Sequence, residues 1–106
     1  MYQVTSIENF RRELKRLAKK HRSLLNDVDE LISQLEGNPQ IGRKMKGNCY
    51  KIRLKISSKK TGKDSGGRVV TCVQIVEQTV HLLTIYDKSE KSDLEHGELD
   101  ALLAQI

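Results

Sequence analysis

The sequence is poor in aromatic residues and in cysteine. It contains no tryptophan, one phenylalanine and three tyrosines, so few rings are available for stacking on unpaired nucleic-acid bases. Its two cysteines, Cys49 and Cys72, are too far apart for a CxxC redox motif or a zinc knuckle, and the three histidines show no metal-ligand spacing. We therefore expect neither a metal site nor a cofactor.

Long hydrophobic runs are also missing. The apolar stretches are only a few residues long, and the N-terminus lacks the charged-then-apolar pattern of a signal peptide. These absences predict a cytoplasmic protein with no membrane segment. A length of 106 residues with 37% hydrophobic residues is enough for one compact core, so we expect a single domain over residues 1–106.

Positive charge is concentrated in the middle of the chain. Residues 40–68 carry ten basic residues and one acidic residue, a net charge of +9, whereas the whole chain carries +5. Residues 69–106 carry two basic and seven acidic residues. Surfaces that serve only solubility usually mix both signs, so this segregation predicts an anion-binding surface with an acidic counterpart elsewhere.

The segment from Tyr50 to Ile56 alternates strictly between apolar or aromatic residues and cationic residues. A period of two is typical of a half-buried β-strand, so Lys51, Arg53 and Lys55 should lie on one face, at intervals of roughly 7 Å. Like charges in a row repel each other, and a polyanion laid along them would relieve that repulsion. The pattern therefore predicts contact with a nucleic-acid backbone.

Hydrophobic periodicity and turn residues predict the order β-α-α-β-β-β-α. The expected elements are a strand at 2–5, a helix opened by a Thr5–Glu8 capping box, a helix capped by Ser23 and ended by Gly37 and Pro39, strands at 50–56, 68–76 and 80–86, and a helix after a Ser92–Glu95 capping box. Residues 40–48 should form a basic loop. The predicted class is α+β: a mostly antiparallel sheet of about four strands, an N-terminal helical hairpin packed on one face, and a short C-terminal helix.

Three segments together resemble the RelE/ParE superfamily of type II toxin–antitoxin toxins. They are Cys49–Leu54, Ser65–Val70 and Ile85–Lys91, and the preceding helix pair fits the same pattern. Each segment alone is weakly specific, but their order and spacing extend the resemblance over nearly the whole chain.

The resemblance implies a small toxin held inactive by a cognate antitoxin, as a homodimer or a toxin–antitoxin hetero-oligomer. RelE-like members cut messenger RNA on the ribosome without a metal and so inhibit translation. ParE-like members share the fold and inhibit DNA gyrase by binding it. A third hypothesis is a member that binds RNA but cuts it weakly or not at all.

Individual residues can be matched to the family pattern. Lys51 and Arg53 match its paired basic strand positions, Arg68 matches the arginine that opens the next strand, and Lys88 matches the lysine after the last strand. The chain departs from RelE-like members at two places. Ser89 replaces an arginine and Glu95 replaces the catalytic tyrosine, while Lys91 and Tyr86 lie near enough in sequence to substitute.

RNA cleavage by its own 2′-hydroxyl requires a base, an acid and positive charge around the phosphorane. We assign the charge to Arg53 and Arg68, which must then lie on the same side of the sheet. Lys51 or Lys55 is the candidate base, and Lys88 positions the backbone or acts as acid. Tyr86 either stacks on a base, donates a proton or is simply a core aromatic at a strand end. Further candidates for backbone binding, with a solvated surface as the alternative, are Lys59, Lys60, Lys63, Lys91, Arg43, Lys44 and Lys46.

Overall fold

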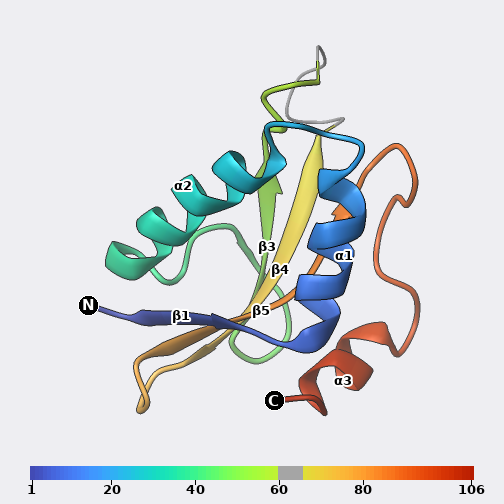
Figure 1. Ribbon diagram of the computed structural model, residues 1–106. Helices are drawn as coiled ribbons and strands as arrows, with labels where there is room; N and C mark the ends of the chain where they lie inside the picture. Colours follow the sequence, from blue (N-terminus) through green and yellow to red (C-terminus); the bar gives the residue numbers. More distant parts are fainter. Residues whose placement is uncertain (60–65) are drawn as a thin grey trace.

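The computed structural model describes residues 1–59 and 66–106 (Figure 1). Its elements are, in chain order, β1 (Gln3–Ser6), α1 (Glu8–Ala18), α2 (Leu24–Gly37), β2 (Arg43–Lys44), β3 (Cys49–Leu54), β4 (Gly67–Gln74), β5 (Thr79–Asp87) and α3 (Glu98–Leu103). The predicted α+β class, helical hairpin and short C-terminal helix are confirmed. The described residues hold five strands rather than about four, because β2 forms inside the segment that was expected to be a loop.

The strands form one sheet in the order β1-β5-β4-β3-β2. Strands β3, β4 and β5 are antiparallel neighbours, as the predicted hairpins require. Strand β1 lies along β5 in parallel, with Val4 opposite Val80, and β2 pairs antiparallel with β3. Cys49 and Cys72 are directly opposite each other on β3 and β4, and both are free thiols.

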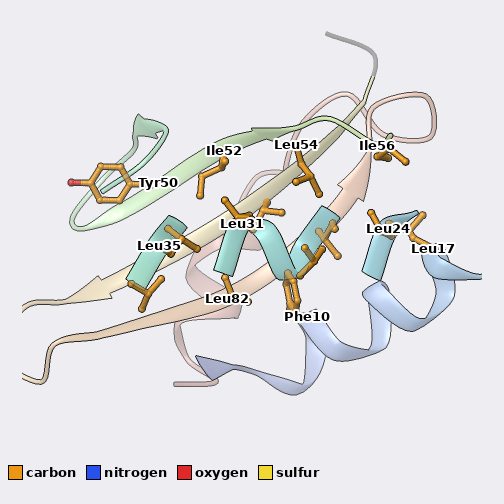
Figure 2. Close-up of a cluster of buried hydrophobic side chains, with 14 of the residues drawn as sticks. Phe10, Leu17, Leu24, Leu31, Leu35, Tyr50, Ile52, Leu54, Ile56 and Leu82 are labelled. Atoms are coloured by element: carbon orange, nitrogen blue, oxygen red, sulfur yellow. The ribbon is translucent and has the colours of Figure 1, made fainter. Parts of the chain in front are cut away.

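Helices α1 and α2 cover one face of the sheet, where the larger hydrophobic core lies. Alternate residues of β3 enter this core, and Figure 2 shows Ile52 and Leu54 above Leu31 of α2. Ile52 and Leu54 are 3% and 7% exposed, whereas Arg53 between them is exposed. The predicted period of two is therefore confirmed, and each fully buried aliphatic side chain contributes about 1.5–3 kcal/mol of hydrophobic stabilisation.

The opposite face of the sheet is covered in part by α3. A second cluster of buried side chains joins this helix to β4 and β5: Ile7, Val70, Leu83, Tyr86 and Leu102. Strand β4 is consequently buried on both faces, as its continuous apolar run predicts. None of the helices in the described residues is long and apolar enough to cross a membrane.

The first two predicted helix caps are wrong in their details. Thr5 does not cap α1, because it belongs to β1 and pairs with His81 of β5. Ser23 is the N-cap residue of α2, but its hydroxyl bonds the side chains of Asp27 and Ser58 instead of a helix N–H. Pairing within the sheet and side-chain contacts between elements therefore override the local capping signals.

The predicted start of the last helix is also wrong. Helix α3 begins at Glu98, after Gly97, which adopts a left-handed conformation with φ of 81°. Glu95 does not complete a capping box with Ser92. Its backbone N–H instead donates to the carboxylate of Glu98. The segment 88–97 is therefore irregular, and it runs from the end of β5 to α3 (Figure 1).

Candidate functional site

Three neighbouring strands place Arg53, Arg68 and Tyr86 in one row. Arg53 of β3 is directly opposite Arg68 of β4, and Arg68 is directly opposite Tyr86 of β5. Residues in register on adjacent strands project to the same face, with Cβ atoms roughly 4.5–5.5 Å apart. Their chain neighbours Ile52, Val69 and Ile85 belong to the core under α1 and α2. The row therefore lies on the other face of the sheet.

This row lies in a cleft of about 650 Å³. The described residues that line the cleft are Ile41, Gly42, Arg43, Lys51, Ile52, Arg53, Arg68, Tyr86, Lys88, Ser92 and Asp93. Five of these side chains are cationic and one is anionic. A cleft lined by one sign of charge concentrates oppositely charged ligands, so this one favours an anion with several negative groups.

Arg68 is fixed deep in the cleft. Arg68 is 7% exposed, and its Nη1 donates a hydrogen bond to the carbonyl of Gly67 at 3.0 Å. A guanidinium stays protonated and presents a planar fork that matches the oxygens of a phosphate. Arg53, its cross-strand neighbour, is exposed. The pair thus combines a fixed buried cation with an accessible one, and the requirement that both lie on one side of the sheet is met.

Tyr86 contributes a buried hydroxyl. Its oxygen makes no hydrogen bond of good geometry within the described residues, although the Asp93 carboxylate lies close to it, and the Nζ of Lys91 lies 5.6 Å from the centre of its ring. Burial raises the pKa of Tyr86 to about 12, and the Asp93 carboxylate adds to this rise while Arg68 opposes it. The hydroxyl therefore keeps its proton at neutral pH and can donate to a ligand oxygen. Burying it without a partner costs about 1–3 kcal/mol.

Lys51 forms an ion pair with an acid that sequence reasoning missed. Its Nζ lies 2.6 Å from Oδ1 of Asp93, which also accepts the backbone N–H of Leu94 at 2.8 Å. The bond from Lys51, followed by that from Leu94, lowers the pKa of Asp93. Asp93 lies in the irregular segment between β5 and α3, where no periodicity signals which way a side chain faces.

Lys88 and Ser89 follow the row at the end of β5. The Nζ of Lys88 donates to the carbonyl of Ser92 at 2.9 Å, and its side chain lines the cleft. Ser89 is turned away from the cleft, because its hydroxyl and its backbone N–H both donate to the carboxylate of Asp87. At the position where RelE-like members carry an arginine, this chain therefore has a serine whose hydrogen bonds hold the end of β5.

Asp87 holds the end of β5 in place. Its side chain is nearly fully buried and accepts hydrogen bonds from Nε2 of His21 at 2.9 Å and from Nζ of Lys59 at 3.0 Å, in addition to those from Ser89. Burial alone would raise the pKa of Asp87, but these bonds, led by the two from Ser89, lower it well below its usual range. This cluster fixes the strand end from which Tyr86 and Lys88 project.

Gly42 shapes the rim of the cleft. It has φ of +103°, a conformation that glycine adopts without steric cost. A Cβ atom at this position would lie 2.5 Å from the carbonyl oxygen of Lys51 and 2.8 Å from the side chain of Ile52. The absence of a side chain therefore allows the chain to pass closely over β3 and to place Arg43 beside the cleft.

The remaining predicted basic residues are dispersed. Lys46 pairs with Asp100, Lys91 pairs with Glu98, and Lys59 pairs with Asp87, all outside the cleft lining. Lys44 is exposed on β2, and Lys55 lines a neighbouring hollow beside α2. Two further candidates, Lys60 and Lys63, lie outside the described residues. Within residues 1–59 and 66–106, no three histidine, cysteine or acidic side chains are grouped closely enough to hold a metal ion.

No family model matches the sequence. The fold is similar to that of solved toxins. A mutant of the Escherichia coli toxin RelE in the free state is 19% identical, with a TM-score of 0.61 over 98% of this chain and 92% of that chain. The E. coli RelBE toxin–antitoxin complex is 22% identical, with a TM-score of 0.61 over 82% of this chain and 96% of that chain. The RelBE2 toxin–antitoxin complex of Mycobacterium tuberculosis is 18% identical, with a TM-score of 0.59 over 81% of this chain and 90% of that chain. These similarities show that the chain has a RelE-like toxin fold.

Proposed function

We propose that this protein is the toxin of a type II toxin–antitoxin system and that its cleft cuts messenger RNA on the ribosome, without a metal. One observation carries the proposal. Arg53, Arg68 and Tyr86 stand in one row across three strands, inside a cleft that has a net positive lining. The RelE-like fold supports the same conclusion.

The row supplies groups that phosphodiester cleavage requires. Attack by the 2′-hydroxyl places extra negative charge on the phosphate, and preorganised cations stabilise that charge. Arg53 and Arg68 would bind the non-bridging oxygens, and Tyr86 would donate its hydroxyl proton in a hydrogen bond to the same group or to the ribose. Lys88, at the edge of the row, would position the backbone or protonate the leaving oxygen.

The scarcity of aromatic residues favours a substrate presented by a larger assembly. Tyr86 is the one aromatic side chain among the described residues of the cleft lining, and it is buried rather than open for stacking. Single-strand binding that reads bases usually depends on several exposed rings. An mRNA already held in the ribosomal decoding site would need only backbone contacts from this protein, which would then act in the cytoplasm.

The proposal includes an antitoxin partner. Two of the similar structures are toxin–antitoxin complexes. An acidic polypeptide would complement residues 40–68, whose net charge is +9, and would compete with RNA for the cleft. The test is coexpression with the protein encoded by the adjacent reading frame. Growth should be restored and the two proteins should copurify as a hetero-oligomer, whereas persistent arrest without copurification would contradict this partner.

One specific observation favours a second function, inhibition of DNA gyrase by a ParE-like mode of binding. Ser89 bonds Asp87, and Glu95 lies outside the cleft lining. The two positions that carry an arginine and the catalytic tyrosine in RelE-like members therefore add nothing to the cleft. A protein-binding toxin would need neither group, and an RNA-binding member with little activity would also tolerate their loss.

Induced expression in bacteria distinguishes these functions. The proposed nuclease should stop translation within minutes and leave transcripts with cuts in phase with codons. A gyrase inhibitor should instead cause DNA damage with intact transcripts. A protein that only binds RNA should do neither.

Site variants connect the effect to the cleft. Arg53→Ala and Arg68→Ala should abolish the cuts, provided that circular dichroism shows each variant to be folded. Lys15→Ala is the matched control, because it removes one positive charge from the exposed face of α1, away from the cleft. Cuts that persist in both arginine variants would overturn the assignment of this site.

A further inference from the structure

The carboxylate of Asp93 is the one acidic group among the described residues that line the cleft. Oδ1 accepts both of its described hydrogen bonds, from Lys51 and from the backbone of Leu94. Oδ2 accepts no hydrogen bond of good geometry within the described residues, although the carboxylate lies close enough to the Tyr86 hydroxyl to raise the pKa of that group, and the Asp93 side chain is 60% exposed. Asp93 thus presents to the cleft an acceptor oxygen that only the Tyr86 hydroxyl approaches among the described donors.

A negative charge lowers the affinity of a cleft whose only function is to bind a polyanion. Asp93 opposes phosphate through simple repulsion, and it also neutralises Lys51, which would otherwise contact the ligand. The nearby hydroxyl of Tyr86 is more than nine-tenths buried and makes no hydrogen bond of good geometry within the described residues, so it can bind a ligand oxygen beside the Asp93 carboxylate. An acidic side chain next to this hydroxyl is therefore better explained by a role in the reaction than by a role in binding.

The other described groups of the lining are poorly suited to accept a proton. Arg43, Arg53 and Arg68 are permanently protonated. The ammonium of Lys51 donates a hydrogen bond to the Asp93 carboxylate, so the use of Lys51 as a base would require this ion pair to open. Lys55, the other lysine considered as a base, does not line the cleft. Asp93 is already a carboxylate at neutral pH, since the bonds from Lys51 and Leu94 lower its pKa.

We propose that Asp93 is the general base that activates the 2′-hydroxyl of the RNA, an inference that rests on the proposed RNA cleavage. The 2′-hydroxyl proton passes to Oδ2 of Asp93 while the bond between the 2′-oxygen and phosphorus forms. The bond between phosphorus and the 5′-oxygen breaks, and that oxygen takes a proton from the ammonium of Lys88. The products are a 2′,3′-cyclic phosphate and a 5′-hydroxyl end, so atoms and charge balance without a co-reactant.

The ion pair with Lys51 makes the base dependent on substrate. In the free protein, Lys51 holds Asp93 and weakens it as a base. A phosphate in the cleft competes for the ammonium of Lys51. Once Lys51 turns to the phosphate, the carboxylate loses its strongest described donor and becomes a better proton acceptor. Arrival of the RNA backbone would thus activate the group that attacks it.

The test compares cleavage with binding. Single-turnover cleavage is measured on purified ribosomes programmed with a defined mRNA, and binding is measured by the fluorescence anisotropy of a labelled RNA decamer. Asp93→Asn should slow cleavage at least 100-fold, within the range that general bases contribute, and should bind RNA equally or more tightly. Asp93→Glu should recover cleavage to within about tenfold of the natural chain. Glu95→Gln, which removes a charge from the same segment outside the cleft lining, is the matched control.

Each outcome decides between explanations. Circular dichroism first shows whether Asp93→Asn is folded. If the folded variant cuts as fast as the natural chain or faster, Asp93 is not the base, and its carboxylate only repels the RNA from the cleft. Products with a 3′-hydroxyl and a 5′-phosphate would also overturn the assignment, because that route does not use the 2′-hydroxyl. If the natural chain cuts no RNA, the proposed function itself fails, and the role of Asp93 fails with it.

Discussion

The ring of His21 donates a hydrogen bond to the carboxylate of Asp87 over 2.9 Å and thereby joins the connection between α1 and α2 to the end of β5. The two residues are 66 positions apart in the sequence. Lys59 and Ser89 bond the same carboxylate, so it is buried but well satisfied. This cluster lies directly behind the strand end that carries the candidate site, and it gives the first prediction.

Asp87→Asn should lower the free energy of unfolding by roughly 2–4 kcal/mol, because it removes the charge that Lys59 and His21 face in a buried setting. Urea denaturation monitored by circular dichroism measures this change. Asp29→Asn, on the exposed side of α2, should stay within about 0.5 kcal/mol of the natural chain. Equal stability of both variants would show that the cluster contributes little.

The same carboxylate predicts a pH dependence. The pKa of Asp87 is lowered in the folded state, so the unfolded chain binds its proton at a higher pH. The stabilisation is therefore complete above the unfolded pKa of about 3.9 and is lost as the pH falls below it. Denaturation midpoints should be steady from pH 7 to about pH 5 and should fall below pH 4, with a smaller fall in Asp87→Asn. A fall between pH 7 and pH 5 that Asp87→Asn removes would contradict this account.

Tyr86→Phe should separate stability from activity. The change deletes a buried hydroxyl that makes no hydrogen bond of good geometry within the described residues and lies close to the Asp93 carboxylate, so the free energy of unfolding should stay equal or rise by about 1 kcal/mol. Cleavage should fall, because the donor to the bound phosphate or ribose is lost. Tyr2→Phe removes a hydroxyl outside the cleft lining and should change neither quantity. Marked destabilisation of Tyr86→Phe would mean that the hydroxyl is satisfied in the free protein.

Gly42→Ala should destabilise the fold by roughly 2–4 kcal/mol, because it combines an unfavourable φ with a contact of 2.5 Å to the backbone of β3. Gly37→Ala is the control. A Cβ atom there meets nothing within 4 Å, so that variant should be neutral or slightly more stable. Thermal unfolding of the two variants compares them directly. Equal melting temperatures would show that the rim relaxes freely.

Arg53→Ala should reduce the dependence of RNA binding on salt. Each phosphate contact to a single strand contributes about 0.7 to the slope of log affinity against log salt concentration. Loss of this exposed cation from the cleft should lower the slope by about that amount. Lys15→Ala, far from the cleft, should leave it unchanged. Equal reductions in the two variants would indicate diffuse attraction rather than a defined contact in the cleft.

Some of the site could be predicted from sequence because it depends on strand periodicity. The alternation around Arg53 identifies which face it occupies, and pairing of consecutive strands brings Arg68 beside it. Tyr86 ends an apolar strand and joins the same row. These relations follow from the period of two and from antiparallel hairpins, which are local properties of the sequence.

Other features depend on contacts between distant segments. β1 pairs in parallel with β5, and β2 forms only because β3 lies beside it. Thr5 has the sequence signature of a helix cap but is a strand residue, because a partner 76 positions later supplies hydrogen bonds. Asp93 lies in an irregular segment, and its bond to Lys51 spans 42 positions. No short-range pattern encodes such contacts.

Cleavage of a defined mRNA on purified ribosomes tests the central claim, that the cationic cleft is a ribonuclease site. The natural chain should cut the message in phase with codons, and Arg53→Ala should cut it at least 30-fold more slowly, a loss of about 2 kcal/mol of transition-state stabilisation. Lys15→Ala should cut within twofold of the natural rate. Intact message with the natural chain, or equal rates for Arg53→Ala and the natural chain, would contradict the account.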